Sequence, residues 1–223
     1  MVRKGLREIL KKGMSPILKK KYAAYSSKDQ HINFQGLNIL VKAGVFHPGL
    51  FFSTNTIIKY LEEIDLNKKK VLELGCGTGS ISVWASKKGA AVTASDINQK
   101  ALDNVKENAV RNDVAIESQK SDLFENLKVN DYDYVLINPP YYAEEAKNMD
   151  EKAWFCGEEF EYFQKLFGEL DELKESTKLL MVLSEDCDIK SISKIAKAND
   201  LKLSLIYTSN SMLEHNSLYQ ITH

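Results

Sequence analysis

The chain has 223 residues, of which 43% are hydrophobic and 27% are charged, a composition typical of a globular domain that can build its own core. A formal net charge of −1 argues against a protein whose whole surface coats nucleic acid or membrane. The N-terminus lacks the apolar core of a signal peptide, and no stretch approaches the roughly 18 apolar residues of a membrane span. We therefore predict a soluble, cytoplasmic protein without a membrane span.

Cysteine and histidine usage bears on metals and disulfides. The cysteines are an odd, widely separated set without Cys-x-x-Cys spacing, namely Cys76, Cys156 and Cys187. The histidines are equally scattered, at His31, His47, His215 and His223. This spacing fits a reducing compartment and no zinc site, so we predict no structural metal.

The N-terminal segment differs from the rest of the chain in charge. Eight lysines and arginines lie within the first 21 residues, against one acidic residue, Glu8. Residues 1–28 predict two short basic helices broken near Gly13 and Pro16. Alternation around Gln35 and Gly36 predicts a hairpin within residues 31–46. We interpret residues 1–50 as an N-terminal extension and residues 51–223 as the main domain.

The main domain begins with a predicted helix capped by Ser53 or Thr54. Strands and helices then alternate, which is typical of a doubly wound, mostly parallel α/β sheet. The predicted strands are 71–74, 91–95, 116–120, 134–137 and 179–183, followed by an antiparallel pair at 202–208 and 217–222. The predicted helices are 80–88, 99–111, 159–173 and 189–198.

A glycine-rich loop follows the first of these strands and opens a helix. It reads Glu73-Leu74-Gly75-Cys76-Gly77-Thr78-Gly79. Glycines let a ligand approach the backbone, and helix N–H groups point toward it. A dinucleotide fingerprint has Gly-x-Gly-x-x-Gly spacing, whereas this loop has Gly-x-Gly-x-Gly after an acidic residue. The variant resembles the first motif of class I S-adenosylmethionine-dependent methyltransferases, and the alternative is a tight turn without a ligand.

Acidic residues end the next two strands. Asp96, followed by Ile97, is placed to accept hydrogen bonds from ribose hydroxyls of a nucleoside, although Asp96 can also be a helix N-cap. Asp122 and Leu123 follow the third strand. The resemblance implies that they offer a carboxylate to the adenine amine and an apolar wall to its ring, and a solvated strand end is the alternative.

The turn Asn138-Pro139-Pro140-Tyr141 follows the fourth strand and suits a particular chemistry. The lone pair of an amide or exocyclic amine nitrogen is delocalised, so the nitrogen is a poor nucleophile. The Asn138 oxygen and the Pro139 carbonyl can accept its N–H groups and hold it in line with a methyl donor. Pro140 stiffens the turn, and Tyr141 offers a ring face to the planar group. A plain proline turn is the alternative.

Together these motifs resemble the class I methyltransferases that carry Asn-Pro-Pro-Tyr. That group includes enzymes that methylate glutamine in release factors, guanine in ribosomal RNA, and adenine in DNA and RNA. The resemblance covers about residues 45–222 and implies a seven-stranded sheet of order 3-2-1-4-5-7-6 with the last strand antiparallel. It also implies that Thr54 contacts the cofactor, although a helix N-cap remains open. After the turn, Phe155-Cys156-Gly157 departs from the glycine-rich stretch of the glutamine branch, which leaves the substrate open.

The sequence therefore predicts an S-adenosyl-L-methionine-dependent N-methyltransferase acting on a planar nitrogen of a macromolecule, either a protein glutamine or an RNA or DNA base. The basic N-terminal arm could contact RNA or be a solvated helix face, and the acidic character of residues 144–175 disfavours a polyanion there. Two other hypotheses stay open at this point: a nicotinamide-dependent oxidoreductase and a catalytically silent S-adenosylmethionine-binding module.

Overall fold

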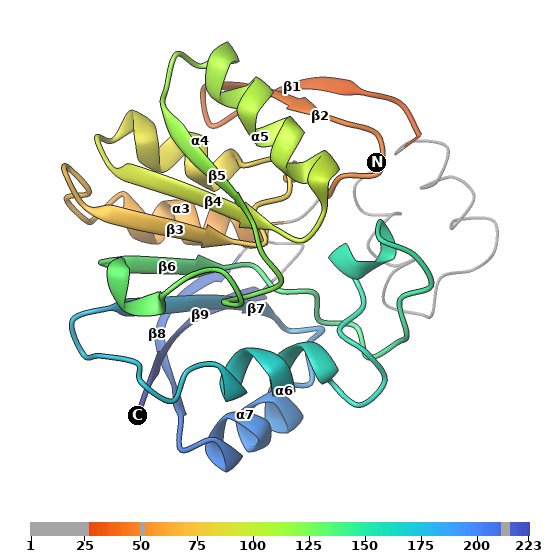
Figure 1. Cartoon of the computed structure of the whole chain (residues 1–223), viewed down its shortest axis with the longest axis vertical. Coiled ribbons are helices and arrows are strands. Elements are labelled where there is room, and N and C mark those ends of the chain that lie inside the picture. Colours follow the sequence, from red (N-terminus) through yellow and green to blue (C-terminus); the bar gives the residue numbers. More distant parts are fainter. Residues whose placement is uncertain (1–26, 50–51, 211–214) are drawn as a thin grey trace.

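A computed structural model describes residues 27–49, 52–210 and 215–223. The two predicted basic helices and the basic N-terminal arm lie outside these residues, apart from residues 27 and 28. The described chain forms a two-stranded hairpin and one large sheet with helices on both faces (Figure 1).

The large sheet has seven strands in the order β5-β4-β3-β6-β7-β9-β8. β9 runs antiparallel to both of its neighbours, and the other neighbouring pairs are parallel. Counted from β3 as the first strand, this is the predicted order 3-2-1-4-5-7-6, so the predicted fold is confirmed. The strands are β3 (Lys70–Leu74), β4 (Ala91–Asp96), β5 (Ile116–Lys120), β6 (Tyr134–Ile137), β7 (Lys178–Ser184), β8 (Lys202–Asn210) and β9 (His215–Thr222).

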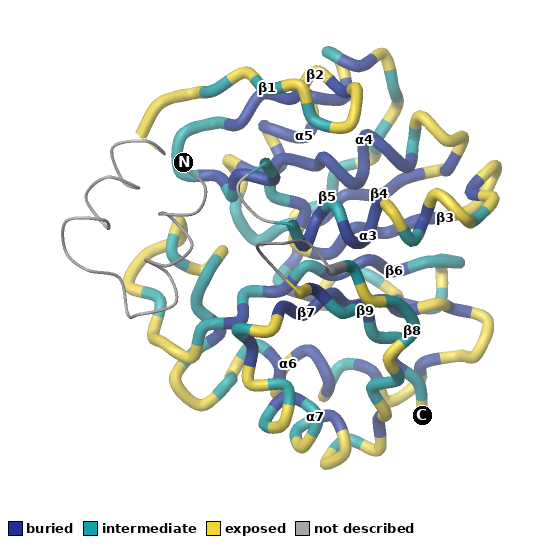
Figure 2. Tube along the Cα trace, turned by 180° about the vertical axis from the view of Figure 1, so that it is seen from behind, coloured by how far each residue is buried: buried dark blue, intermediate teal, exposed yellow. Residues whose placement is uncertain are grey.

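Two helical layers cover the sheet. One layer contains α3 (Ser53–Leu61), α4 (Ser80–Lys87) and α5 (Gln99–Arg111), and the opposite layer contains α6 (Glu161–Gly168) and α7 (Ile189–Ala198). Because both faces are covered, β6 and β7 are nearly continuous apolar runs rather than alternating ones. Figure 2 shows these central strands buried between the layers.

The hairpin consists of β1 (Gln30–Phe34) and β2 (Leu37–Val41). Gln35 and Gly36 both have positive φ, which is the geometry of a tight two-residue hairpin turn, so the predicted hairpin is confirmed. Its apolar side chains Leu37, Ile39 and Val41 pack in one cluster with α3 and α4. The boundary at residue 50 stays a prediction.

Two local predictions were wrong. Ser53 and Thr54 do not cap α3, because the helix already begins at Ser53 after Phe52, and both side chains are buried inside its first turn. The predicted helix over 159–173 is shorter, since Phe160 precedes α6 in a left-handed conformation. Beyond Gly168 the backbone continues as turns, in which the N–H groups of Glu169, Leu170 and Leu173 each donate to the carbonyl three residues back.

Candidate active site

A cavity of about 700 Å³ opens where β3, β4, β5 and β6 end. Parallel strands bring their carboxyl ends to the same edge of a sheet, so the segments that follow them meet there. The volume lies within the usual range for a small-molecule site, roughly 300–1,000 Å³. The predicted residues that line it are Thr54, Glu73, Gly75, Cys76, Gly77, Asp96, Ile97, Asp122, Leu123, Asn138, Pro139, Pro140 and Tyr141.

The glycine loop between β3 and α4 exposes its backbone to this cavity. Gly75 has φ +74°, and a Cβ atom added there would meet no other atom within 4 Å. The loop is held from behind, because the N–H groups of Gly75 and Cys76 both donate to the Ser95 carbonyl at 2.9 and 2.8 Å. The space in front of Gly75 is therefore open for a ligand to approach the backbone.

Gly79, also predicted to contact the cofactor, does not line the cavity. It is buried, has φ +70°, and precedes α4 as its N-cap. A Cβ atom added to Gly79 would lie 2.1 Å from Cγ2 of Val105 on α5. The missing side chain of Gly79 thus serves helix packing, and its contact with a cofactor stays a prediction.

Glu73 reaches the cavity wall but is engaged within the protein. Its carboxylate accepts hydrogen bonds from the Ser82 backbone N–H at 2.8 Å and from the Ser82 hydroxyl. Burial raises the pKa of the Glu73 carboxyl to about 8, despite these two donors. Glu73 therefore ties the glycine loop to the first turn of α4, and its role toward a ligand stays a prediction.

This burial predicts a pH effect on stability. The unfolded Glu73 carboxyl ionises near pH 4.5 and the folded one near pH 8, so raising the pH across this window favours the unfolded chain. Between about pH 4.5 and 8 we expect wild-type protein to lose on the order of 1–4 kcal/mol of unfolding free energy relative to Glu73→Gln. Urea unfolding at both ends of the window measures this, and parallel pH profiles for the two proteins would contradict it.

Asp96 closes the floor of the cavity beside the loop. Its two carboxylate oxygens accept from the backbone N–H groups of Gly77 at 3.0 Å and Asn98 at 2.8 Å. Burial raises the pKa of Asp96, and the backbone donors partly offset this. The helix N-cap of α5 is Asn98, which accepts from Lys100, so the alternative role of Asp96 as N-cap is wrong.

Asp122 and Leu123 lie at the same edge after β5. Asp122 forms an ion pair with Lys165 of α6, with 2.6 Å between Nζ and Oδ2. Leu123 is buried with φ +53°. Sequence patterns gave no sign of the ion pair, because Lys165 lies 43 residues away. The expected contact with adenine stays a prediction.

The Asn138–Tyr141 turn leaves β6 directly into the cavity. Pro139 and Tyr141 are buried, and the Tyr141 ring packs on Tyr142 with 4.9 Å between ring centroids. The chain then pairs with a later segment, since the Tyr142 carbonyl accepts from the Cys156 N–H at 2.9 Å. This pairing brings residues 153–158 to the cavity wall.

Several lining residues escaped the sequence analysis. Phe46 and Trp154 contact each other with 5.0 Å between ring centroids, joining the segment after the hairpin to the loop after the turn. Tyr162 of α6 also lines the cavity, and burial together with the nearby Asp96 and Asp122 carboxylates raises its pKa. Tyr162 lies in no motif, and nothing in the local sequence marks it.

Across residues 27–49, 52–210 and 215–223, no group of three or more His, Cys, Asp or Glu side chains is placed to hold a metal ion. In those ranges no helix is both long and apolar enough to cross a membrane.

The family model of the methyltransferase small domain matches residues 36–199, well over half of the chain. The chain belongs to the methyltransferase small domain family. The matched residues include the glycine loop, Asp96 and the Asn138–Tyr141 turn of this methyltransferase domain. The predicted resemblance is thereby confirmed, and the prediction of S-adenosyl-L-methionine as methyl donor is consistent with it.

Individual relatives differ in what they methylate. A protein of Methanocaldococcus jannaschii named "Putative protein N5-glutamine methyltransferase" is 39% identical over 111 residues, which are 49% of this chain and 54% of the relative. The chain thus spans about half the length of that curated relative.

Two solved structures share the fold. An E. cuniculi complex responsible for methylation of the eRF1 translation termination factor is 19% identical, with TM-score 0.60, covering 80% of this chain and 98% of the other. A T. thermophilus 16S ribosomal RNA guanine N2 methyltransferase in complex with AdoMet and guanosine is 15% identical, with TM-score 0.62. The match covers 86% of this chain and 50% of the other. At these identities the likeness concerns the fold alone.

Proposed function

We propose that this chain is an S-adenosyl-L-methionine-dependent N-methyltransferase that acts on a planar amide or amine nitrogen of a macromolecule. One observation carries the proposal: the glycine loop with Asp96 and the Asn138–Tyr141 turn line the same cavity at the ends of the neighbouring strands β3, β4 and β6. A cofactor-binding half and an acceptor-binding half thus share one space.

The cofactor half suits a nucleoside with a charged tail. Open space in front of Gly75 admits the ligand to the backbone, and Asp96 retains lone pairs for ribose hydroxyls after accepting one backbone N–H on each oxygen. Ile97 and Leu123 offer apolar contacts to the base. When bound, S-adenosylmethionine supplies an electrophilic methyl group on its sulfonium.

The acceptor half binds and orients the substrate nitrogen for methyl transfer. The Asn138 side-chain oxygen and the Pro139 carbonyl accept the two N–H groups, which draws the lone pair out of conjugation and orients it. Positive charge develops on the nitrogen as it gains the methyl group, and these fixed acceptors stabilise that charge until the proton leaves to solvent. Tyr141 packs on the planar group and restricts its tilt.

Charge around the cavity favours a protein substrate over a nucleic acid. Glu145, Glu158 and Glu161 line it, and like charges repel the phosphates of RNA. Lys152 and Lys165 also line it, and Lys165 is paired with Asp122. The name of the Methanocaldococcus relative points the same way, so we favour a glutamine amide as the acceptor. An RNA base is the alternative outcome.

The decisive experiment incubates the protein with S-adenosylmethionine carrying a labelled methyl group and with separated RNA, ribosome and protein fractions. We expect label in protein with wild type and far less with Asn138→Ala. Label in RNA would replace the glutamine proposal by RNA methylation. Binding of NADH but not of S-adenosylhomocysteine would favour the oxidoreductase alternative, and cofactor binding without transfer would favour a silent module.

Asp96→Ala tests the cofactor half separately. Removing this carboxylate should weaken S-adenosylhomocysteine binding by about 1.5–3 kcal/mol, the usual scale for hydrogen bonds to a charged group. Titration calorimetry measures the change, with Asp103→Ala as a control because that carboxylate lies on α5 and bonds the exposed Gln99 amide. Equal affinity of Asp96→Ala and wild type would contradict the assignment.

A further inference from the structure

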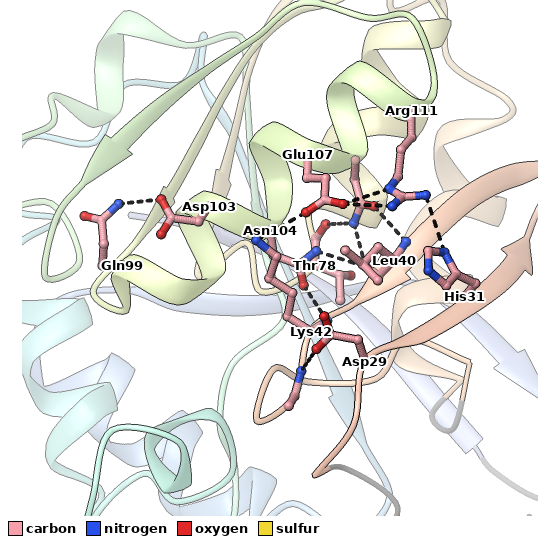
Figure 3. Close-up of polar contacts among 12 residues, drawn as sticks. Asp29, His31, Leu40, Lys42, Thr78, Gln99, Asp103, Asn104, Glu107 and Arg111 are labelled. Carbon is pink, nitrogen blue, oxygen red and sulfur yellow. Dashed lines mark hydrogen bonds and ion pairs between the residues drawn. The ribbon is translucent and has the colours of Figure 1, made fainter.

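Three asparagines, two on α5 and one at its C-cap, hold the hairpin. Asn104, Asn108 and Asn112 recur every four residues, and they bond alternate residues of β2 and its end in antiparallel order. Figure 3 shows Asn104 beside Leu40 and Lys42 of this segment. Four helical residues rise about 6 Å and two strand residues about 6.7 Å, so the two spacings match. The partners on β2 and its end are Asn38, Leu40 and Lys42, each of whose N–H groups donates to an asparagine oxygen at 2.7 to 3.0 Å.

This asparagine ladder replaces a third strand at the edge of the hairpin. β2 pairs with β1 on one side, and its other edge is satisfied by the side-chain amides of α5. The Asn104 and Asn108 amides also donate to the Leu40 carbonyl at 2.9 and 2.8 Å, and the Asn112 amide donates to the Asn38 carbonyl at 2.9 Å. Asn104 and Asn108 are fully buried. Loss of these bonds would therefore leave buried backbone polar groups with neither a protein partner nor water to bond.

Asn108 differs from the other two in reaching the glycine loop. Its second amide hydrogen donates to the Thr78 carbonyl at 2.9 Å. Thr78 lies between Gly77 and Gly79 and lines the cavity. The side-chain bonds of Asn104 and Asn112 go to the hairpin and to α5 itself. Asn108 therefore joins α5, the hairpin and the loop through one side chain.

A second contact fixes the same part of the loop to α5. Gly79 packs against Val105, one turn before Asn108. Val45 and Phe46, which follow the hairpin, lie over Gly77 at 3.9 and 3.8 Å from the position of an added Cβ. The loop is thus enclosed between α5 and the segment that the ladder anchors.

We propose that Asn108 is a positioning residue for the cofactor, a role that rests on the proposed function. By holding the Thr78 carbonyl, its amide sets the orientation of the peptide groups that face the cavity. It acts through the loop and does not touch the reacting atoms. Loss of this hydrogen bond lets the loop change its conformation. Cofactor affinity then falls, in addition to any loss of folding stability.

The test compares Asn108→Ala with Asn104→Ala, an equally buried member of the ladder without a bond to the loop. S-adenosylhomocysteine dissociation constants are measured by calorimetry, well below the unfolding midpoint of each variant. We expect both variants to lower the thermal midpoint. Asn108→Ala should raise the dissociation constant about tenfold and Asn104→Ala less than threefold, with KM for S-adenosylmethionine rising in parallel and kcat nearly unchanged.

Equal dissociation constants for the two variants would overturn the proposal and leave the ladder a folding device. If Asn108→Ala does not fold, Asn108→Ser is used with the same expectation, because its short hydroxyl cannot span Leu40 and Thr78. A wild-type protein that fails to bind S-adenosylhomocysteine would instead reject the proposed function, so the two failures are distinguishable.

Discussion

Asn138→Ala should lower kcat for methyl transfer by about 10²–10³-fold, the scale seen when one preorganised polar contact to a transition state is removed. The side chain follows β6 at the wall of the cavity, and its proposed acceptor oxygen has no substitute in alanine. Because the contact strengthens as charge develops on the nitrogen, the loss should appear in kcat. The labelled methyl assay measures it under saturating S-adenosylmethionine.

Asn138→Asp is the matched variant, since it has nearly the same shape and keeps an acceptor oxygen. We expect it to retain more activity than alanine. S-adenosylhomocysteine affinity should stay within about threefold of wild type in both variants, as the main cofactor contacts are proposed at the glycine loop and Asp96. Full activity of Asn138→Ala would show that the Asn138 side chain has no role in the reaction.

Gly79→Ala should destabilise the fold by about 2–5 kcal/mol, because two costs add. The residue has φ +70°, which disfavours any side chain, and a Cβ atom would lie 2.1 Å from Cγ2 of Val105 in the packed interior. Urea unfolding monitored by circular dichroism measures the free energy. If Gly79→Ala unfolds at the same urea concentration as wild type, α5 moves aside without loss of unfolding free energy, which would contradict the prediction.

Gly75→Ala is the matched control within the same loop. It has nearly the same φ, +74°, but an added Cβ meets no atom within 4 Å. We expect a stability loss of about 1–2 kcal/mol from backbone strain alone. Its larger effect should be on S-adenosylhomocysteine affinity, since the new methyl group projects into open space at the cavity. Gly79→Ala should therefore mainly lower stability, and Gly75→Ala should mainly lower S-adenosylhomocysteine affinity.

The alternation of strands and helices and the two motifs followed from local patterns, whereas the strand order was implied by the resemblance to the class I methyltransferases. Apolar runs such as Tyr134–Ile137, separated by helical periodicity, predict a parallel sheet, and parallel strands bring their following loops to one edge. The sequence thus predicts that the glycine loop and the Asn138–Tyr141 turn meet at this edge. Side-chain chemistry in each motif then indicated the reaction.

The role of individual residues within those motifs depended on packing. Glycines 75 and 79 look alike in sequence, yet one faces the cavity and the other faces Val105, because the loop turns between them. Asp122 is predicted to offer its carboxylate to a ligand, and only the structure shows that α6 brings Lys165 against the same carboxylate. Sequence patterns describe what a segment prefers and carry no information about which distant side chain it meets.

By itself, the sequence determined the alternation of strands and helices, the glycine loop and the Asn138–Tyr141 turn, because each depends on residues close together in the chain. The tertiary structure alone decided the asparagine ladder, the contact of Phe46 with Trp154 and the place of Tyr162 in the cavity wall. Leu40 and Asn108 are 68 residues apart, and their bond forms only after the sheet has brought α5 and the hairpin together. The physical reason is that such contacts arise from the packing of whole elements, which no local periodicity records.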